Sequence, residues 1–189
     1  ILQHIGRIFG LYILVQENEM FYIVDQHAAQ EKILYEKFRK IADGKKSEIQ
    51  DLLIPINIDL SPKEFDILSG LKDNLEKLGF YIEEFGKNSF VLKSVPVIIG
   101  DKSATNIIIE VIGNKKIGNI SGTSEKILND IIKSACSTAI KSGDKVSEPE
   151  AIKLLEELFE CDNPYTCPHG RPTIVKITKN ELDKKFQRL

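Results

Sequence analysis

Two short stretches, far apart in the chain, carry side chains that can bind a metal ion or move a proton. The first, DQHAAQEKILYE at residues 25–36, places Asp25, His27 and Glu31 where an apolar run ends and a helical pattern begins. At about 100° per residue, His27 and Glu31 point the same way as the apolar side chains that follow them in the helix. Burying a carboxylate and an imidazole is costly unless they are paired or bound to a metal. The stretch therefore predicts one half of a metal site.

A structural explanation of the same residues stays open. Asp25 is suited to cap the helix, since a carboxylate at that position accepts from a free backbone N–H. His27 and Glu31 can then lie in solvent at the first turn, where acidic groups are common. Glu36 falls on the far side of the helix, and we expect it to tie the helix to its surroundings.

The second stretch is CPHGRP at residues 167–172. Cys167 and His169 are two residues apart, so in an extended segment they face the same side and can bind one ion. A thiolate with an imidazole suits zinc and other transition metals. The alternative is a proline-rich turn with a buried thiol. Cys136, on a predicted helix, would by itself be a core residue, but together with these two it becomes a candidate ligand.

The elements that must position these residues follow from periodicity and turn residues. A capping box at Ser61 and Glu64 starts the clearest helix. Pro55 places its strand at a sheet edge or in a bulge. We predict strands at 5–16, 20–24, 49–60, 80–86, 89–100 and 173–178, and helices at 26–42, 61–79, 104–112, 124–142 and 148–160, with a short last helix ending at 186–188 and a loop at 113–123.

Composition limits the class of protein. The chain has 189 residues, 42% hydrophobic and 29% charged, which suits one large domain or two small ones. No apolar run approaches the roughly 18 residues that a membrane span needs, and the start lacks the order of a secretory signal. Three cysteines favour reduced thiols and a cytoplasmic location. A net charge of −2 argues against a surface that holds nucleic acid strongly by itself.

Four motifs together resemble one known family. DQHA-x2-E-x4-E at 25–36, SACSTAIKSGD at 134–144, CPHGRP at 167–172 and FQR at 186–188 have the order and spacing of the C-terminal domain of MutL, a DNA mismatch-repair protein, of the nicking type. The resemblance spans nearly the whole chain. One position departs from the pattern, because Ser137 stands where the family usually has a basic residue. A role of that side chain in holding phosphate is therefore in doubt.

The resemblance implies a metal-dependent endonuclease that nicks duplex DNA. Its catalytic residues would be Asp25, His27 and Glu31. Its metal ligands would be Asp25, His27, Glu31, Cys136, Cys167 and His169. The family works with Mn²⁺ and also binds Zn²⁺, so we expect catalytic manganese and structural or regulatory zinc. Two ions about 3.5–4 Å apart, bridged by Glu31, would activate a water and stabilise both the attacking and the leaving oxygen of a phosphodiester. Motif residues Arg171 and Arg188 have no assigned role.

The resemblance also implies partners. QDLLIP at 50–55 resembles the family's motif for docking on the replication sliding clamp, with Gln50, Leu53, Ile54 and Pro55 as the contacts. An ordinary edge strand is the alternative. A clamp threaded on DNA would keep this domain on the DNA, which an acidic domain does poorly by itself. Homodimerisation, weak binding of duplex DNA by this domain, and contact with a mismatch-recognition protein through the full-length chain are further expectations.

The expected fold is α+β with two subdomains. Residues 1–45 and 124–189 would form a discontinuous dimerisation and endonuclease subdomain, an α/β sandwich, and residues 46–123 an inserted regulatory α/β subdomain. Because the chain begins with Ile1 rather than Met, we expect it to be part of a longer protein. The resemblance implies that an ATPase precedes it and that the protein is bacterial. The alternative function is a non-catalytic dimerisation module of a repair scaffold, with a metal that only stabilises the fold.

Overall fold

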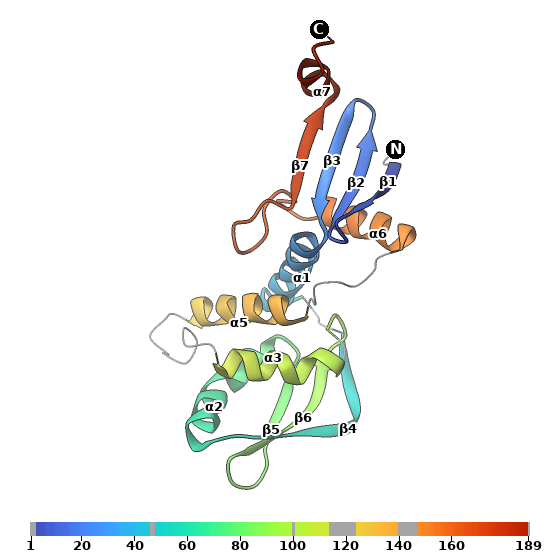
Figure 1. Ribbon diagram of the computed structural model, residues 1–189. Coiled ribbons are helices and arrows are strands. Elements are labelled where there is room, and N and C mark those ends of the chain that lie inside the picture. The colour runs from blue at the N-terminus through green and yellow to red at the C-terminus, as the bar shows by residue number, and fades with distance from the viewer. Residues whose placement is uncertain (1–2, 46–47, 100, 114–123, 140–146, 189) are drawn as a thin grey trace. The chain divides into compact units, whose positions relative to one another are not determined.

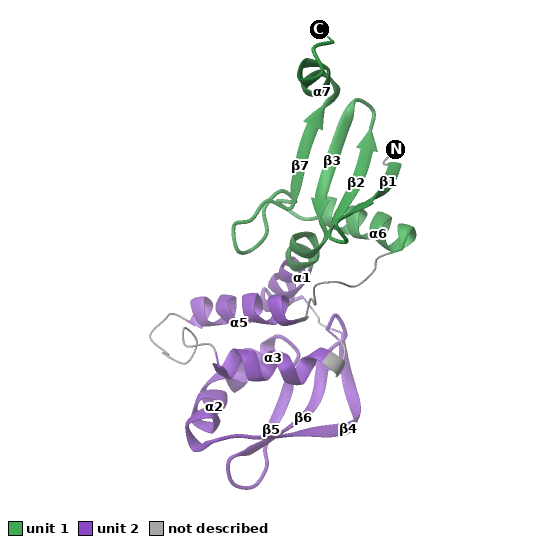
Figure 2. Cartoon of the chain, in the orientation of Figure 1, with its two compact units in different colours: residues 1–33, 140–189 green, residues 34–139 purple. Residues whose placement is uncertain are grey.

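A computed structural model describes residues 3–45, 48–99, 101–113, 124–139 and 147–188. The chain divides into two compact units, residues 1–33 with 140–189 and residues 34–139 (Figure 2). Each unit combines helices with one antiparallel sheet, which confirms the predicted α+β class. Within the described ranges, no helix has the length and apolar character of a membrane span.

The first unit is built on a four-stranded sheet in the order β1-β2-β3-β7 (Figure 1). All neighbouring strands are antiparallel. Its elements are β1 (Gln3–Ile8), β2 (Tyr12–Glu17), β3 (Met20–Asp25), the start of α1 (Gln26–Ala42), α6 (Glu148–Phe159), β7 (Ile174–Thr178) and α7 (Lys179–Lys185). The last strand of the chain therefore lies beside the strand that leads into α1.

The predicted single strand at residues 5–16 is wrong. The structure has two strands there, joined by a tight turn in which Leu11 donates its N–H to the Ile8 carbonyl at 3.2 Å. Phe9 and Gly10 both have positive φ, 52° and 67°, as a two-residue hairpin turn of this hand requires. Phenylalanine is a rare residue in that conformation, so the apolar run gave no turn signal at Phe9.

One face of this sheet carries the core of the first unit. Alternate strand residues such as Ile13, Val15 and Val24 are buried there against residues of α1 and α6, among them Ala29 and Leu155. The period of two along each strand explains why their neighbours in sequence face the opposite side. The start of α1 is thus fixed on the sheet by its own small apolar residues.

The second unit is built on a three-stranded antiparallel sheet in the order β4-β6-β5. Its elements are the rest of α1, β4 (Ile49–Asp59), α2 (Pro62–Lys77), β5 (Tyr81–Glu84), β6 (Ser89–Pro96), α3 (Asp101–Gly113) and α5 (Ser124–Ala139). Its core is larger and combines leucine, isoleucine and phenylalanine residues of the helices and strands; Phe38, Leu71, Phe80 and Phe90 are fully buried.

Helix α2 shows how local sequence sets an element of this unit. Ser61 Oγ accepts from the Glu64 N–H, and the Glu64 carboxylate accepts from the Ser61 N–H at 2.8 Å. This is the predicted capping box, and its hydrogen bonds lower the pKa of Glu64. Leu68, Leu71 and Leu75 follow at helical spacing and are buried. Cap and periodicity therefore agree.

Some other helix and strand ends differ from the predicted ones, and the predicted position of Pro55 is confirmed. Strand β6 ends at Pro96 and α3 already begins at Asp101, so the predicted strand was too long and the predicted helix too short. Strand β4 lies at a sheet edge, and its register shifts between Asp51 and Ile56. Pro55 lies within that shift, as its missing N–H predicts. The predicted loop at 113–123 falls, apart from its first residue, outside the described residues.

The unit boundaries differ from the expected subdomain boundaries. Contacts place the second half of α1 and all described residues of α5 in the unit of residues 34–139, whereas the expected insert spans residues 46–123. Leu34 and Ile41 of α1 pack on the core of the second unit, and Ile131 and Ile132 of α5 belong to it. Dimerisation, catalytic and regulatory roles for the two parts of the chain remain predictions.

Candidate metal centre

The candidate metal centre lies at the end of the four-stranded sheet where β3 passes into α1. Asp25 is the last residue of β3 and caps the helix, since its Oδ1 accepts from the Ala28 N–H at 2.9 Å. Two backbone bonds fix this junction: Asp25 N–H donates to the Thr173 carbonyl at 2.9 Å and Gln26 N–H to the Leu11 carbonyl at 3.1 Å. The capping interpretation of Asp25 is confirmed, and its role as a ligand stays a prediction.

Glu31 is the central residue of the site. Its side chain is 1% exposed, so the prediction that it points inward is confirmed. Oε1 lies 3.1 Å from His27 Nε2, one helical turn before it, and Oε2 lies 3.1 Å from His169 Nδ1, 138 residues away. The Arg171 guanidinium lies 3.6 Å from Oε2. A buried carboxylate is therefore surrounded by two imidazoles and a guanidinium, as the cost of burying a charge requires.

The CPHGRP loop is held in shape by its own backbone. Cys167 N–H donates to the Arg171 carbonyl at 2.8 Å, and Gly170 N–H donates to the Cys167 carbonyl at 2.9 Å. Gly170 has φ of 85°, a left-handed conformation that glycine adopts without strain. Thr166 and Pro172 form a bridge that closes the loop. These bonds turn Cys167 and His169 toward one point.

Three side chains have the spacing of a metal site. One ligand atom each from Glu31, Cys167 and His169 lies within 4.8 Å of the others. Cys167 is 4% exposed and forms no disulfide. Carboxylate, thiolate and imidazole are all zinc ligands, and three protein ligands with an open fourth position are typical of catalytic zinc. His27, against the other oxygen of Glu31, extends this set.

The remaining predicted ligand and two motif residues are not members of this group of three. Cys136 is on α5 and fully buried in the core of the second unit, so its thiol packs there as a core residue, and its role as a ligand stays a prediction. Glu36 is on α1 in the same unit, 8% exposed. Arg188 follows α7, with its guanidinium 5.9 Å from the Phe186 ring. Ser137 is exposed on α5.

Sequence reasoning singled out Arg171 as a motif residue but gave it no role. The structure places its guanidinium against Glu31. The signal was its position two residues after His169, and only the closed loop shows that this spacing brings the guanidinium to Oε2. No periodicity argument applies to such a loop.

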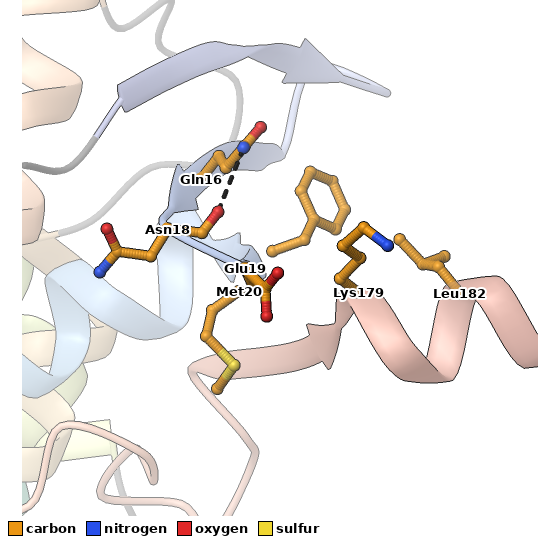
Figure 3. A pocket seen from close by; sticks show the side chains of 7 residues that line it. Gln16, Asn18, Glu19, Met20, Lys179 and Leu182 are labelled. Carbon is orange, nitrogen blue, oxygen red and sulfur yellow. Dashed lines mark hydrogen bonds between the residues drawn. The ribbon is translucent and has the colours of Figure 1, made fainter.

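A separate hollow lies at the opposite end of the same sheet. Figure 3 shows it between the β2–β3 turn and α7. Its volume is about 210 Å³. It is lined mainly by apolar surface, including Met20, Phe21 and Leu182. Two of its polar side chains are engaged locally: Gln16 donates to the Asn18 carbonyl, and Lys179 pairs with Asp183. The hollow is therefore an apolar cavity rather than a cluster of reactive side chains.

The predicted clamp-binding segment is exposed on β4. Leu53 is 103% exposed and Ile54 is 81% exposed. Gln50 and Pro55 are exposed as well. Gln50 pairs with Val95 of β6, whereas Leu53, Ile54 and Pro55 lie within the register shift of β4, so this part of the edge does not pair with β6. Two large apolar side chains thus project from a sheet edge in the second unit.

Comparison with known proteins gives one consistent answer. The family model described as the MutL C-terminal dimerisation domain matches residues 5–146. The DNA mismatch repair protein MutL of Thermoanaerobacter pseudethanolicus is 41% identical over 185 residues, which cover 98% of this chain and 30% of that protein. The proteins of the same name from Caldanaerobacter subterraneus and Clostridium botulinum are each 40% identical over 98% of the chain and cover 31% and 28% of their own lengths. The chain thus spans about 30% of the length of these relatives, and it belongs to the family of MutL C-terminal dimerisation domains.

Proposed function

We propose that this chain is a metal-dependent endonuclease domain that nicks duplex DNA during mismatch repair in a bacterial cytoplasm, acting as a homodimer docked on the replication sliding clamp. The observation that carries the proposal is the buried Glu31 with Cys167 and His169 beside it. A structural zinc site is closed by four protein ligands, whereas three ligands leave a position for water. The donor set therefore supports catalysis over a purely structural metal.

The donors fit a divalent ion. Glu31, Cys167 and His169 would hold it, and Glu31 offers its second oxygen on the side of His27. A bound divalent ion lowers the pKa of a coordinated water and stabilises the charge that develops on phosphodiester oxygens. The sulfur ligand favours zinc, while oxygen ligands suit manganese. Separate oxygens of Glu31 facing His27 and His169 support the expectation that Glu31 serves two ions.

The chain's own residues orient this site. Glu31 fixes both imidazole rings through contacts of 3.1 Å. Burial of Glu31 and Cys167 keeps water from one side, which strengthens electrostatic interactions there. His27 and His169 are 25% and 33% exposed, so the opposite side is open to a large substrate. A long polymer such as duplex DNA can reach a site of this kind.

Homodimerisation has a suitable surface in the first unit. Leu14, Ile23 and Val175 form one cross-strand row and alternate with residues of the buried face. Among the described residues, no helix of the core cluster covers this row. Phe21 and Ile177 form the next row, and Phe21 also lines the hollow of Figure 3. A continuous apolar sheet face of this kind is typical of a protein interface.

Clamp docking would use the exposed apolar edge of β4. A side chain such as Leu53, fully exposed in the free chain, gains most by entering a partner's apolar pocket. The unpaired part of the edge leaves its backbone groups available as well. A clamp that encircles DNA would compensate for the net charge of −2. We further propose that an ATPase and the contact with a mismatch-recognition protein belong to a part of the full-length protein that this chain does not include.

The deciding experiment is a nicking assay on supercoiled plasmid with Mn²⁺. We expect wild type to nick, and Glu31→Gln and Asp25→Asn to lose activity while remaining folded and dimeric. Glutamine keeps the size of Glu31, so circular dichroism should be unchanged. Wild-type protein that binds metal and dimerises without nicking would favour the alternative, a non-catalytic module stabilised by its metal.

The dimer surface has its own test. Ile23→Glu together with Val175→Glu should convert the dimer to a monomer in sedimentation velocity, because charges would be buried without partners. Ile109→Glu is the matched control, since Ile109 is 54% exposed on α3 in the second unit. If Ile109→Glu is a monomer, or if the double variant remains a dimer, the dimer interface is not the sheet face that contains Ile23 and Val175.

A further inference from the structure

Arg171 is an exposed side chain that pairs with a buried carboxylate, that of Glu31. Its Nη2 lies 3.6 Å from Glu31 Oε2, the same oxygen that lies 3.1 Å from His169 Nδ1. The Arg171 side chain is 61% exposed, whereas that of Glu31 is 1% exposed. The buried charge is thus neutralised from the solvent side by a long, flexible group that can leave without unpacking the core.

The same oxygen is a donor of the candidate metal site. An ion held by Glu31, Cys167 and His169 would stand close to the Arg171 guanidinium. Arginine keeps its charge at any physiological pH, so two positive charges would compete for one carboxylate. Pairing of Arg171 with Glu31 and binding of a metal therefore oppose each other.

The loop permits Arg171 to change partners. Cys167 is held by the backbone carbonyl of Arg171 at 2.8 Å, not by its side chain. The guanidinium can therefore swing away while Cys167 and His169 keep their positions. A guanidinium fork matches the geometry of phosphate oxygens as well as that of a carboxylate.

We propose that Arg171 is a positioning residue that couples metal loading to DNA: it pairs with Glu31 in the free protein and releases Glu31 when it pairs with a phosphate of duplex DNA. The inference rests on the proposed function, since it needs both a metal and a DNA substrate. Coupling between two ligands is reciprocal. DNA therefore tightens metal binding by the same factor by which metal tightens DNA binding.

The test is a titration of Zn²⁺ and of Mn²⁺ into wild type, Arg171→Gln and Arg171→Lys by calorimetry, with and without a short DNA duplex. Without DNA, Arg171→Gln should bind metal about tenfold more tightly, because the competing charge is gone. Arg171→Lys keeps the charge and should stay near wild type. Lys153→Gln is the matched control, since Lys153 is 76% exposed on α6 of the same unit.

The effect of DNA gives the second comparison. We expect the duplex to tighten metal binding to wild type by more than it does for Arg171→Gln, because only wild type has a guanidinium to transfer. Equal or weaker metal binding by folded Arg171→Gln without DNA would overturn the inference, as would an equal effect of DNA on both proteins. A wild-type protein that binds neither metal would instead contradict the proposed function.

Discussion

Glu31 and Leu53 are opposite extremes of side-chain exposure. Glu31 is a charged residue that is 1% exposed in the first unit, and Leu53 is an apolar residue that is 103% exposed in the second. Folding alone favours the reverse in both places, because burying a charge costs free energy and burying leucine gains it. Positions that run against the usual distribution are where function is expected.

The two regions also differ in how they are held. Glu31 is surrounded by side chains from α1 and from the CPHGRP loop, and backbone bonds fix that loop. The segment around Leu53 lies in a register shift at a sheet edge. A preorganised buried cluster suits chemistry, which needs fixed geometry. An exposed edge suits docking, because the partner completes the structure.

The largest expected effect is at the buried cluster. Cys167→Ser should remove the bound metal and lower nicking about 100-fold or more, because serine is a poor zinc ligand and the ion supplies the chemistry. Metal content by atomic absorption and a plasmid assay measure the two effects. Cys161→Ser is the control, since Cys161 is a buried thiol of the same unit whose Sγ lies 3.5 Å from the Glu157 carbonyl. An equal loss of metal and of nicking in both variants would show that the effect comes from disturbing the fold.

Two leucines of the second unit, one buried and one exposed, test this comparison through the free energy of unfolding. Leu71 is fully buried in the core, so Leu71→Ala should lower the free energy of unfolding by about 2–5 kcal/mol. Leu53→Ala should change it by less than about 0.5 kcal/mol, because exposed residues contribute little. Urea unfolding of both variants measures the difference. A large loss from Leu53→Ala would mean that the edge is covered in the folded protein.

Docking gives a smaller but more specific effect. Leu53→Ala with Ile54→Ala should lower clamp-stimulated nicking about tenfold, in line with the loss of two anchors at an interface. Nicking without the clamp should be unchanged. Ile109→Ala removes another exposed apolar group of the same unit and serves as the control. Undiminished stimulation of the double variant would leave the segment as an ordinary edge strand.

The smallest effect concerns an exposed charge with local contacts only. The Ser61 hydrogen bonds lower the pKa of Glu64 in the folded state from its usual 4.5. The stabilisation is therefore present above that pH and is lost as the pH falls through the lower folded value. Glu64→Gln should lower the melting temperature slightly at pH 7, and the difference from wild type should shrink in acid. A constant difference would show that ionisation of Glu64 is irrelevant to the cap.

Much of the fold could be read from the chain because it rests on local rules. The bounds predicted for the helix at 26–42 are those of α1, and the capping box at Ser61 starts α2 as expected. The hairpin at Phe9 was missed because an apolar residue took a conformation that favours glycine or asparagine. The ends of β6 and α3 also differ from the prediction, because the apolar residues 97–99 continue the strand pattern past Pro96.

For the candidate site, the sequence by itself determined the donors and their local order: Glu31 one helical turn after His27, and Cys167 two residues before His169. Helical and extended periodicity suffice for that. Only the tertiary structure decided that the two halves meet. Pairing of β7 with β3, and the bond from Asp25 N–H to the Thr173 carbonyl, bring the loop to α1 across 138 residues of sequence. The Asp25 cap is a local contact that the sequence suggested. Long-range sheet pairing leaves no trace in local spacing, so the contact of Arg171 with Glu31 could be seen only in the folded chain.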